Sequence, residues 1–549
     1  MSTEKWVLIS VYNKAAIVEF VQSLVKLGWK ILASGGTAKV LTQNKIDVKD
    51  VAELVGGGAI LDHRVVTLSR EIHAGLLARD NEEDRAELEK LGVPFINMVV
   101  CDFYPLSEEI AKPDATLESV IEKTDIGGPT MVRSAAKGGR IVVADPNDRQ
   151  LVIEQLEILG DIRPETSQYL RAKAEFIVAQ YCLDSARFHS EGGYDGILGI
   201  KFAKLAYGEN RDQSPAFFFQ SIGVPDDLLD WSHFQVISGQ PSYISMADGD
   251  RVLQIVRLMA EAFRQNFGKV PFISVACKHG NPCGAAIDWN DPAEALLKTL
   301  LGDPAAVMGG EVMTNFPITD ELGQLLFAVP DDLQERVGRN RWGLDVVYAP
   351  EFSPNSFDLL GKREKRRLLY NSALLAPSMP PNQWVWRSIQ NGWLVQKAQN
   401  YVLTLQNIRS LVCSQEKREI DLPSLIIAWA VAWRSVSNTV ALAKNEMLIG
   451  LGCGQQDRMA CVQLCLDRAK RSGHNAKGSV AASDGFFPFA CRKEQDDPLE
   501  GPELLANAGC TTVVVPADGK KFEEVSKFFF ERDIMVAFLE PNHRGFFGH

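Results

Sequence analysis

The chain has 549 residues, too many for one ordinary hydrophobic core, so its length predicts at least two domains. A composition of 46% hydrophobic and 23% charged residues is typical of folded globular proteins and excludes a largely disordered chain. The formal net charge of -12 argues against a nucleic-acid polymer as partner. Any phosphate site must therefore be a local collection of basic side chains and backbone N–H groups.

The beginning of the chain, MSTEKWVLISVYNK, has no basic segment followed by an apolar one. No later stretch approaches the about 18 uncharged apolar residues that a membrane helix needs. We therefore expect a cytoplasmic protein without a membrane partner. The cysteines are scattered, and Cys461 and Cys465, four apart in a helical pattern, are interpreted as packing residues rather than metal ligands.

Strand and helix patterns alternate from the start of the chain. Residues 6–11 and 29–34 are predicted strands, and the amphipathic segment 15–28 between them is a predicted helix. Further strands are predicted at 96–105 and 141–148. This alternation predicts a mainly parallel sheet, with ligands at the carboxyl ends of its strands.

Polar, glycine-containing text near residue 200 interrupts this pattern and predicts a domain boundary. We place one domain at 1–199 and a larger one at 200–549, both of the α/β class. The second begins with a predicted amphipathic helix at 251–267 and a strand at 271–277, and later strands are LDVVYAP, TVALAK and TTVVVP. No internal repeat at a fixed period is visible.

A first group of polar residues lies in the amino-terminal domain. Ser34-Gly35-Gly36-Thr37 stands where a strand ends and a helix begins, and N–H groups at a helix N-terminus bind anions. Alone, the motif could be a tight turn capped by Thr37. Other candidates follow neighbouring strands or open a second glycine-rich turn: Ser10, Lys14, Arg64, Thr67, Asp125, Gly127, Gly128, Arg133 and Lys137. Together they predict a phosphate site.

The motifs SVYNK, ASGGTAKVL, HRVVTLSREIHAGLLAR, DFYP and TDIGGPTMVRSAAK resemble the cyclohydrolase domain of the bifunctional AICAR transformylase/IMP cyclohydrolase family in order and spacing. The resemblance covers roughly residues 5–200 and implies a methylglyoxal-synthase-like fold that closes the formylated nucleotide to IMP. It implies that Tyr104, Asp125 and Lys137 serve ring closure. The implied nucleotide-binding residues are Ser10, Lys14, Ser34, Gly35, Gly36, Thr37, Arg64, Thr67, Gly127 and Gly128.

One departure from the family pattern R-V-K-T-L-H-P concerns this first site. The chain reads R-V-V-T-L-S-R from Arg64 to Arg70, so Val66 replaces the family's lysine. Valine cannot donate a hydrogen bond. Losing one donor to an oxyanion costs about 2.7–4 kcal/mol, or on the order of 100- to 1000-fold in rate, unless Arg70 or another base substitutes. We expect a weakened ring closure, although an intramolecular reaction has little entropy to overcome.

A second group lies at the end of the predicted strand 271–277, where the chain reads KHGNPCG. Gly, Asn and Pro make this turn compact, and the adjacent Lys278 and His279 would supply a cation and a base at a cleft. The alternative is a buried structural histidine. Pro282-Cys283 matches half of the zinc deaminase signature, but no second cysteine follows at the needed spacing. We expect neither zinc nor deamination.

KHGNPCG resembles the signature of the family's AICAR transformylase domain, and YGEN, GDPAAVMGG, LDVVYAPEF, RSVSNTVALAK, ASDGFFPF and NHRGFF support this over residues 200–549. The resemblance implies a cytidine-deaminase-like α/β fold and formyl transfer from 10-formyltetrahydrofolate to AICAR, giving FAICAR. It also implies a homodimer with the site at the subunit interface, and it allows a monovalent cation.

In this family the histidine takes a proton from the substrate's 5-amine, the lysine stabilises the oxyanion and an asparagine orients the formyl group, which assigns these roles to His279, Lys278 and Asn438. The implied nucleotide-binding residues are Tyr207, Gly309, Asp345, Arg544 and Phe546, and the implied folate-binding residues are Asp484, Phe486, Pro488 and Phe489.

The second domain also departs from the family. Ala206 stands where an arginine is common, Arg211-Asp212-Gln213 replaces P-H-Q, and the segment after Phe489 is longer. These changes motivate an alternative, a diverged nucleotide-binding or regulatory paralogue without catalysis, and a more distant one, another nucleotide-modifying hydrolase. Retention of Lys278, His279 and Asn438 favours catalysis.

Overall fold

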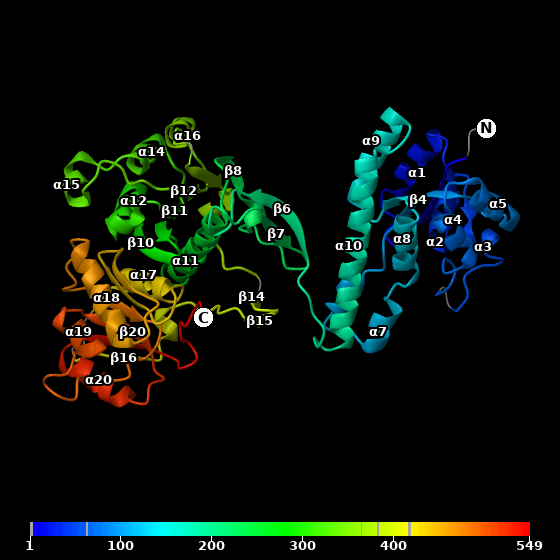
Figure 1. The fold of residues 1–549 in the computed structure, drawn as a ribbon. Coiled ribbons are helices and arrows are strands. Elements are labelled where there is room, and N and C mark those ends of the chain that lie inside the picture. Colours follow the sequence, from blue (N-terminus) through cyan, green and yellow to red (C-terminus); the bar gives the residue numbers. More distant parts are fainter. Residues whose placement is uncertain (1–3, 62–63, 364, 382–383, 415–418, 549) are drawn as a thin grey trace. The chain divides into compact units, whose positions relative to one another are not determined.

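The computed structural model describes residues 4–61, 64–363, 365–381, 384–414 and 419–548. The chain divides into two compact units, Met1–Leu198 and Gly199–His549 (Figure 1). Within the described residues, we find no helix that is both long enough and apolar enough to span a membrane.

The first unit is built on a parallel sheet with the strand order β3-β2-β1-β4-β5. The side chains of β1 alternate between two cores, with Val7 and Ile9 in one and Leu8 in the other. Both faces are therefore covered, as in parallel sheets generally. The strands are β1 (Trp6–Ser10), β2 (Lys30–Ala33), β3 (Lys49–Asp50), β4 (Ile96–Cys101) and β5 (Ile141–Val143). The predicted parallel sheet is confirmed.

Helices pack on both faces of this sheet. α1 and α9 contribute to the core with Val7, and α4, α8 and α10 contribute to the core with Leu8. The helices are α1 (Ile17–Lys26), α2 (Gly35–Gln43), α3 (Val51–Leu54), α4 (Arg70–Leu77), α5 (Glu82–Leu91), α6 (Leu106–Ile110), α7 (Leu117–Glu122), α8 (Gly127–Lys137), α9 (Arg149–Leu159) and α10 (Pro164–His189).

The described residues of the second unit form a 12-stranded mixed sheet with the order β16-β21-β20-β19-β17-β18-β10-β9-β11-β12-β13-β8. Its strands are β8 (Gln235–Ser238), β9 (Phe272–Lys278), β10 (Asn281–Asp288), β11 (Glu311–Thr314), β12 (Val346–Ala349), β13 (Arg367–Tyr370), β16 (Ser410–Val412), β17 (Val440–Lys444), β18 (Met447–Gly452), β19 (Val480–Ser483), β20 (Thr512–Pro516) and β21 (Met535–Leu539). The expectation of a second, larger α/β region is confirmed.

The order of elements in this sheet repeats, although the sequence shows no fixed period. A first half, residues 243–370, consists of a helix, an antiparallel hairpin and three strands that are parallel to one another. A second half, residues 422–539, repeats this arrangement. The first half's helices are α11 (Tyr243–Phe267), α12 (Pro292–Leu301), α13 (Pro304–Val307), α14 (Asp320–Phe327), α15 (Gln334–Val337) and α16 (Pro354–Gly361), and the second half's are α17 (Leu422–Ala432), α18 (Arg458–Arg471), α19 (Gly501–Asn507) and α20 (Phe522–Glu531).

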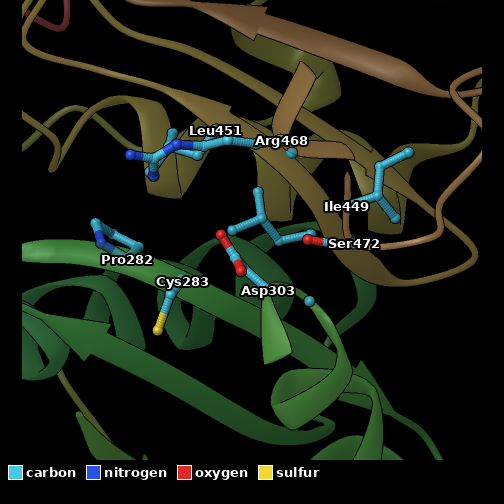
Figure 2. A pocket seen from close by; sticks show the side chains of 10 residues that line it. Pro282, Cys283, Asp303, Ile449, Leu451, Arg468 and Ser472 are labelled. Atoms are coloured by element: carbon cyan, nitrogen blue, oxygen red, sulfur yellow. The ribbon is translucent and has the colours of Figure 1, made fainter. Parts of the chain in front are cut away.

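The two halves join through β10 and β18, which are antiparallel, with Ala286 opposite Met447. Figure 2 shows this joint, where Cys283 from the first half lies across a small void from Leu451 and Arg468 of the second. The void measures about 10 Å³, room for about one water molecule. The antiparallel joint places the end of β9 and the beginning of β17 at one end of the sheet, which we call the His279 end. The end of β17 lies at the opposite end, the Asn445 end.

Two separate two-stranded ribbons complete the second unit: β6 (Gly199–Leu205) with β7 (Ala216–Ser221), and β14 (Trp384–Ile389) with β15 (Gly392–Lys397). Both expose large apolar side chains, among them Phe202, Phe219, Trp393 and Leu394.

Candidate functional site

Part of the predicted phosphate-binding group of the first unit, including Ser10, Ser34 and Thr37, meets where β1 ends and α2 begins. The Ser34 hydroxyl donates to the Ser10 hydroxyl at 3.1 Å. Because α2 begins at Gly35, Ser34 is the N-cap and Thr37 lies inside the helix, where its hydroxyl lies 3.3 Å from the backbone of Val11. The interpretation of Thr37 as the cap is therefore wrong, and its hydroxyl instead ties α2 to the end of β1.

Lys14 lies beside this helix start. Its ammonium donates to the carbonyls of Val11 and Tyr12, and a side chain at Gly36 would lie 3.9 Å from its Cε. Burial lowers the pKa of Lys14, and the negative charge of Asp102 opposes that shift. The structure therefore brings a cation, two hydroxyls and a helix N-terminus together, the groups that bind a phosphate.

The two glycines that begin α8 pack closely against Thr67, a predicted nucleotide-binding residue, and Asp125, a predicted ring-closure residue. A Cβ at Gly127 would lie 2.8 Å from the Thr67 hydroxyl, and one at Gly128 would lie 2.7 Å from the Asp125 carboxylate. The Gly128 N–H donates to that carboxylate at 2.8 Å. Glycine is needed at both positions because any side chain would displace these groups.

Asp125 and Tyr104 form the ionisable part of this group. Burial raises the pKa of Asp125, and the nearby Asp102 raises it further. Burial also raises the pKa of Tyr104, with a contribution from Asp125. Tyr104 packs edge-on against Tyr12, at 5.5 Å between ring centroids, and the Tyr12 carbonyl in turn accepts from the Lys14 ammonium. A protonated phenol beside a carboxylate can donate to an oxygen that gains charge.

Lys137 and Asp125 line one cavity of about 610 Å³, between α8 and α10. Arg133 lines it too and pairs with Glu175 at 3.1 Å. The volume is sufficient for a small-molecule ligand.

The described structure shows no contact between Arg64 or Val66 and the predicted ring-closure residues. Arg64 is exposed and pairs with Glu122. Val66 is half-buried and packs against the core that contains Leu8. Arg70, the nearest candidate to replace the missing lysine, is 76% exposed and pairs with Glu71 at 3.5 Å. In the described structure Arg70 therefore shows no contact with Tyr104, Asp125 or Lys137 through which it would replace a lysine at position 66.

The KHGNPCG motif forms the hairpin turn at the His279 end. Lys278 ends β9 and pairs with Asn281, which begins β10, so His279 and Gly280 are a two-residue loop. Both have positive φ, 54° and 70°, as a type I′ turn requires. The same two residues are anchored by Asp248 of α11, whose carboxylate accepts from the His279 N–H and the Gly280 N–H at 2.7 Å each.

Lys278 lies with two other predicted residues. Its ammonium donates to the Met308 carbonyl at 2.6 Å. A Cβ at Gly309 would lie 3.7 Å from that ammonium and 3.9 Å from the Asp345 carboxylate. Asp345 also pairs with Arg363 at 3.0 Å. One small region beside the exposed His279 imidazole is therefore lined by Lys278, Gly309 and Asp345.

Asn438 belongs to the second half and reaches the same end of the sheet through the strand register. Asn438 precedes β17, whose first residue Val440 pairs with Gly452 at the end of β18. The next residue, Cys453, donates from its thiol to the Asn281 amide at 3.1 Å. The joint between the halves thus brings an asparagine that is 159 residues away in sequence to the end of the sheet that carries His279.

The side chain of Asn438 is held by Arg458. The guanidinium donates to the Asn438 amide oxygen at 2.7 Å and pairs with the Asp484 carboxylate, both charges being almost fully buried. Asp484 also accepts from the Ser437 hydroxyl at 2.6 Å and the Thr439 N–H at 3.0 Å. Asp484 therefore fixes the Asn438 segment from within the core, and a folate contact from its buried carboxylate stays only a prediction.

The aromatic residues after β19 lie close to the carboxyl-terminal segment. A Cβ at Gly485 would lie 2.7 Å from the Phe546 ring, and Phe486 packs tightly against Gly519. The Lys521 ammonium lies over the Phe489 ring, 5.1 Å from its centroid, and Pro488 is exposed. Arg544 pairs with Asp518 and stacks over Phe546 at 5.3 Å. Phe546 also lines a cavity of about 440 Å³ with Trp386 and Arg434.

Tyr207 reaches the same end of the sheet through its backbone, since its carbonyl accepts from the Tyr243 N–H at the start of α11 at 2.9 Å. Within the described part of the chain, its side chain makes no hydrogen bond or ion pair with the other predicted residues.

Two positioning residues escaped the sequence-based prediction. Asp248 interrupts the buried face of α11, and an acidic residue on the apolar face of a helix is a signal that could have been read. Arg458 follows the N-cap of α18, and its link to Asn438 spans 20 residues of sequence. The described residues contain no group of three or more His, Cys, Asp or Glu side chains arranged to hold a metal ion.

Comparisons with known proteins match both units of the chain. The profile described as "AICARFT/IMPCHase bienzyme" matches residues 135–468, and one described as "MGS-like domain" matches residues 16–130. "Bifunctional purine biosynthesis protein PurH" of Bacillus cytotoxicus is 33% identical over 98% of this chain and 99% of its own. The protein of that name from Anoxybacillus flavithermus is 33% identical over 98% of each chain. A solved structure, "Crystal structure of ForH", is 32% identical and covers 35% of this chain and 99% of its own, with a TM-score of 0.32.

Proposed function

Because the chain belongs to the AICARFT/IMPCHase bienzyme family, we propose that it transfers the formyl group of 10-formyltetrahydrofolate to AICAR and so produces FAICAR. The observation that carries this proposal is the Lys278–His279 turn at the end of the sheet to which the fold also brings Asn438. The alternative, a binding paralogue without catalysis, is not favoured, since relatives named "Bifunctional purine biosynthesis protein PurH" match over 98% of the chain.

The residues would divide the reaction as follows. The 5-amine nitrogen of AICAR attacks the formyl carbon and gives its proton to His279, while Lys278 stabilises the oxyanion. The bond from the formyl carbon to N10 of the folate then breaks, and N10 takes up a proton. Asn438 would orient the formyl group. An aromatic amine is a weak nucleophile, so holding it against the carbonyl is a large part of the catalysis.

Nucleotide and folate binding are proposed for residues around this turn. Gly309 and Asp345 lie beside Lys278, which supports a nucleotide site there together with Tyr207, Arg544 and Phe546. Phe486, Pro488 and Phe489 would offer an apolar wall to the pteridine, and a folate contact is also proposed for Asp484.

A homodimer is proposed on the exposed ribbons of the second unit. Trp393 is 43% exposed and Phe219 is 55% exposed on strands whose edges are open to pairing. Exposed aromatic side chains on both ribbons are typical of a surface that a second copy of the chain covers. A cytoplasmic location and a monovalent cation stay predictions.

For the first unit we propose IMP cyclohydrolase activity that is weakened by Val66. Ser10, Lys14, Ser34 and Thr37 would hold the phosphate, and Tyr104, Asp125 and Lys137 would act on the formyl oxygen and the carboxamide. Arg64, which pairs with Glu122, would have to leave that pair to reach a phosphate.

Two product assays on one reaction test these proposals. The protein is mixed with AICAR and 10-formyltetrahydrofolate, and tetrahydrofolate and IMP are followed separately. Tetrahydrofolate is expected to form faster than IMP. Val66→Lys should raise the rate of IMP formation by about 100-fold or more and leave formyl transfer unchanged. No tetrahydrofolate, together with a melting temperature that AICAR raises, would contradict formyl transfer and support a binding protein.

A further inference from the structure

The turn that carries His279 has a strained backbone that needs external support. Positive φ is uncommon for residues other than glycine, and here His279 adopts it, at 54°, directly before Gly280. Their two N–H groups point at one partner, the carboxylate of Asp248, which is only 6% exposed. Charged acceptors form hydrogen bonds roughly twice as strong as neutral ones. A single buried side chain therefore fixes the conformation of the loop.

The second half of the sheet contains the same turn without the carboxylate. Asn445 and Glu446 connect β17 to β18, again with positive φ at both positions, 51° and 62°. The supporting group is the Ser424 hydroxyl of α17, which accepts from the Glu446 N–H at 3.0 Å. One hydrogen bond to a neutral hydroxyl is therefore sufficient to hold a turn of this conformation.

The lysine before each turn is held alike in both halves. Lys278 donates to the Met308 carbonyl at 2.6 Å, and Lys444 donates to the Lys477 carbonyl at 2.6 Å. A glycine follows each carbonyl, Gly309 and Gly478, and both have positive φ. The main differences at the two turns are therefore the imidazole itself and the acid that supports it.

We propose that Asp248 is a positioning residue for formyl transfer, fixing the His279 turn so that the imidazole and the Lys278 ammonium serve one substrate. This inference rests on the proposed function. A hydroxyl would keep the hairpin, as it does in the second half, but would leave one of the two N–H groups unpaired. A shift of about 1 Å in a catalytic group can cost on the order of 100-fold in rate.

The test compares Asp248→Asn with Ser424→Ala, its counterpart in the second half, in the full-length protein. The amide places an N–H₂ donor against an N–H donor while keeping the side chain's size. We expect kcat for formyl transfer to fall about 100-fold in Asp248→Asn, with the AICAR dissociation constant from calorimetry within threefold of wild type. Ser424→Ala should leave both values within threefold. Asp248→Ser, which reproduces the second half's arrangement, should lose about tenfold and serves if Asp248→Asn does not fold.

Other outcomes separate this inference from the proposed function. Equal kcat in wild type and both Asp248 variants would overturn the positioning role alone. A parallel loss of kcat and AICAR affinity would also overturn it, because that pattern reports general damage. Wild-type protein that transfers no formyl group would overturn the proposed function itself.

Discussion

The two ends of the sheet in the second unit have similar hairpin backbones but carry different side chains. At the His279 end, one hairpin turn and the beginning of the other hairpin bring together Lys278, Asp345 and Asn438. At the Asn445 end, the corresponding turn carries Asn445 and Glu446, and the beginning of β9 is held by Asn315, a neutral amide. A duplicated scaffold offers two equivalent places for chemistry. The turn at the His279 end carries an imidazole supported by a buried acid, whereas the Asn445 end carries Glu446 and Asp288 paired with Lys298.

Removing the imidazole should have the largest effect. His279→Ala should lower kcat for formyl transfer by about 100- to 10,000-fold, the usual contribution of a general base. Asn445→Ala, at the equivalent position of the other turn, should stay within threefold. Steady-state rates of tetrahydrofolate formation measure both. An unchanged rate in His279→Ala would remove the base from the mechanism, and an equal loss in both variants would mean that the two ends are not functionally distinct.

The buried ion pair at the His279 end predicts a large difference in stability. Arg458→Met leaves the fully buried Asp484 carboxylate unpaired and should cost about 3–5 kcal/mol. Asn315→Ala at the Asn445 end removes only neutral hydrogen bonds, to Ile273 and Pro271, and should cost about 1–3 kcal/mol.

Urea titration followed by tryptophan fluorescence measures these two costs, since Trp429 and Trp433 are fully buried in the second half. A cost for Arg458→Met below that for Asn315→Ala would contradict the view that the His279 end depends on a buried ion pair.

The two equivalent lysines provide a third comparison. Lys278→Met should reduce kcat by about 100- to 1000-fold, because an oxyanion loses its cation. Lys444→Met loses the same kind of bond to a backbone carbonyl but should leave kcat within threefold. Melting temperatures of both variants show whether the two bonds support the fold equally. If kcat falls alike in both, the role assigned to Lys278 is structural.

The smallest effect concerns Glu311, which stands at the first position of β11, where the second half has Val480 at the first position of β19. Burial and the charge of Asp248 raise the pKa of Glu311, and its carboxyl contacts the Tyr348 hydroxyl at 2.9 Å. A raised pKa means that the folded protein binds this proton more tightly than the unfolded chain does. The stabilisation is complete below the unfolded pKa of about 4.3 and is lost as pH rises through the folded pKa.

Glu311→Gln keeps the neutral form at every pH. It should therefore unfold at a higher temperature than wild type at alkaline pH, by a free-energy difference on the order of 1 kcal/mol, and at nearly the same temperature near pH 4. Calorimetry at several pH values measures this. A difference that shrinks as pH rises would show that Glu311 is ionised in the folded protein.

Local sequence signals predicted much of the fold because they depend on neighbouring residues. The alternation of strand and helix patterns indicated the parallel sheet of the first unit, and segments such as 271–277 and 439–444 became β9 and β17 with small shifts at their ends. The helix predicted at 251–267 begins eight residues earlier, at Tyr243, because Ser242 caps it. Polar residues before residue 251 concealed this start.

The sequence by itself determined that the chain is α/β, that Ser34 to Thr37 open a helix at a strand end and that Lys278 and His279 occupy a compact turn. Only the tertiary structure decided that Asn438 reaches the same end of the sheet as His279, that Asp248 supports the turn and that Arg64 pairs with Glu122. The reason is physical. Turns and caps arise from interactions within a few residues, whereas these contacts depend on strand register and helix packing between segments that lie far apart in the chain.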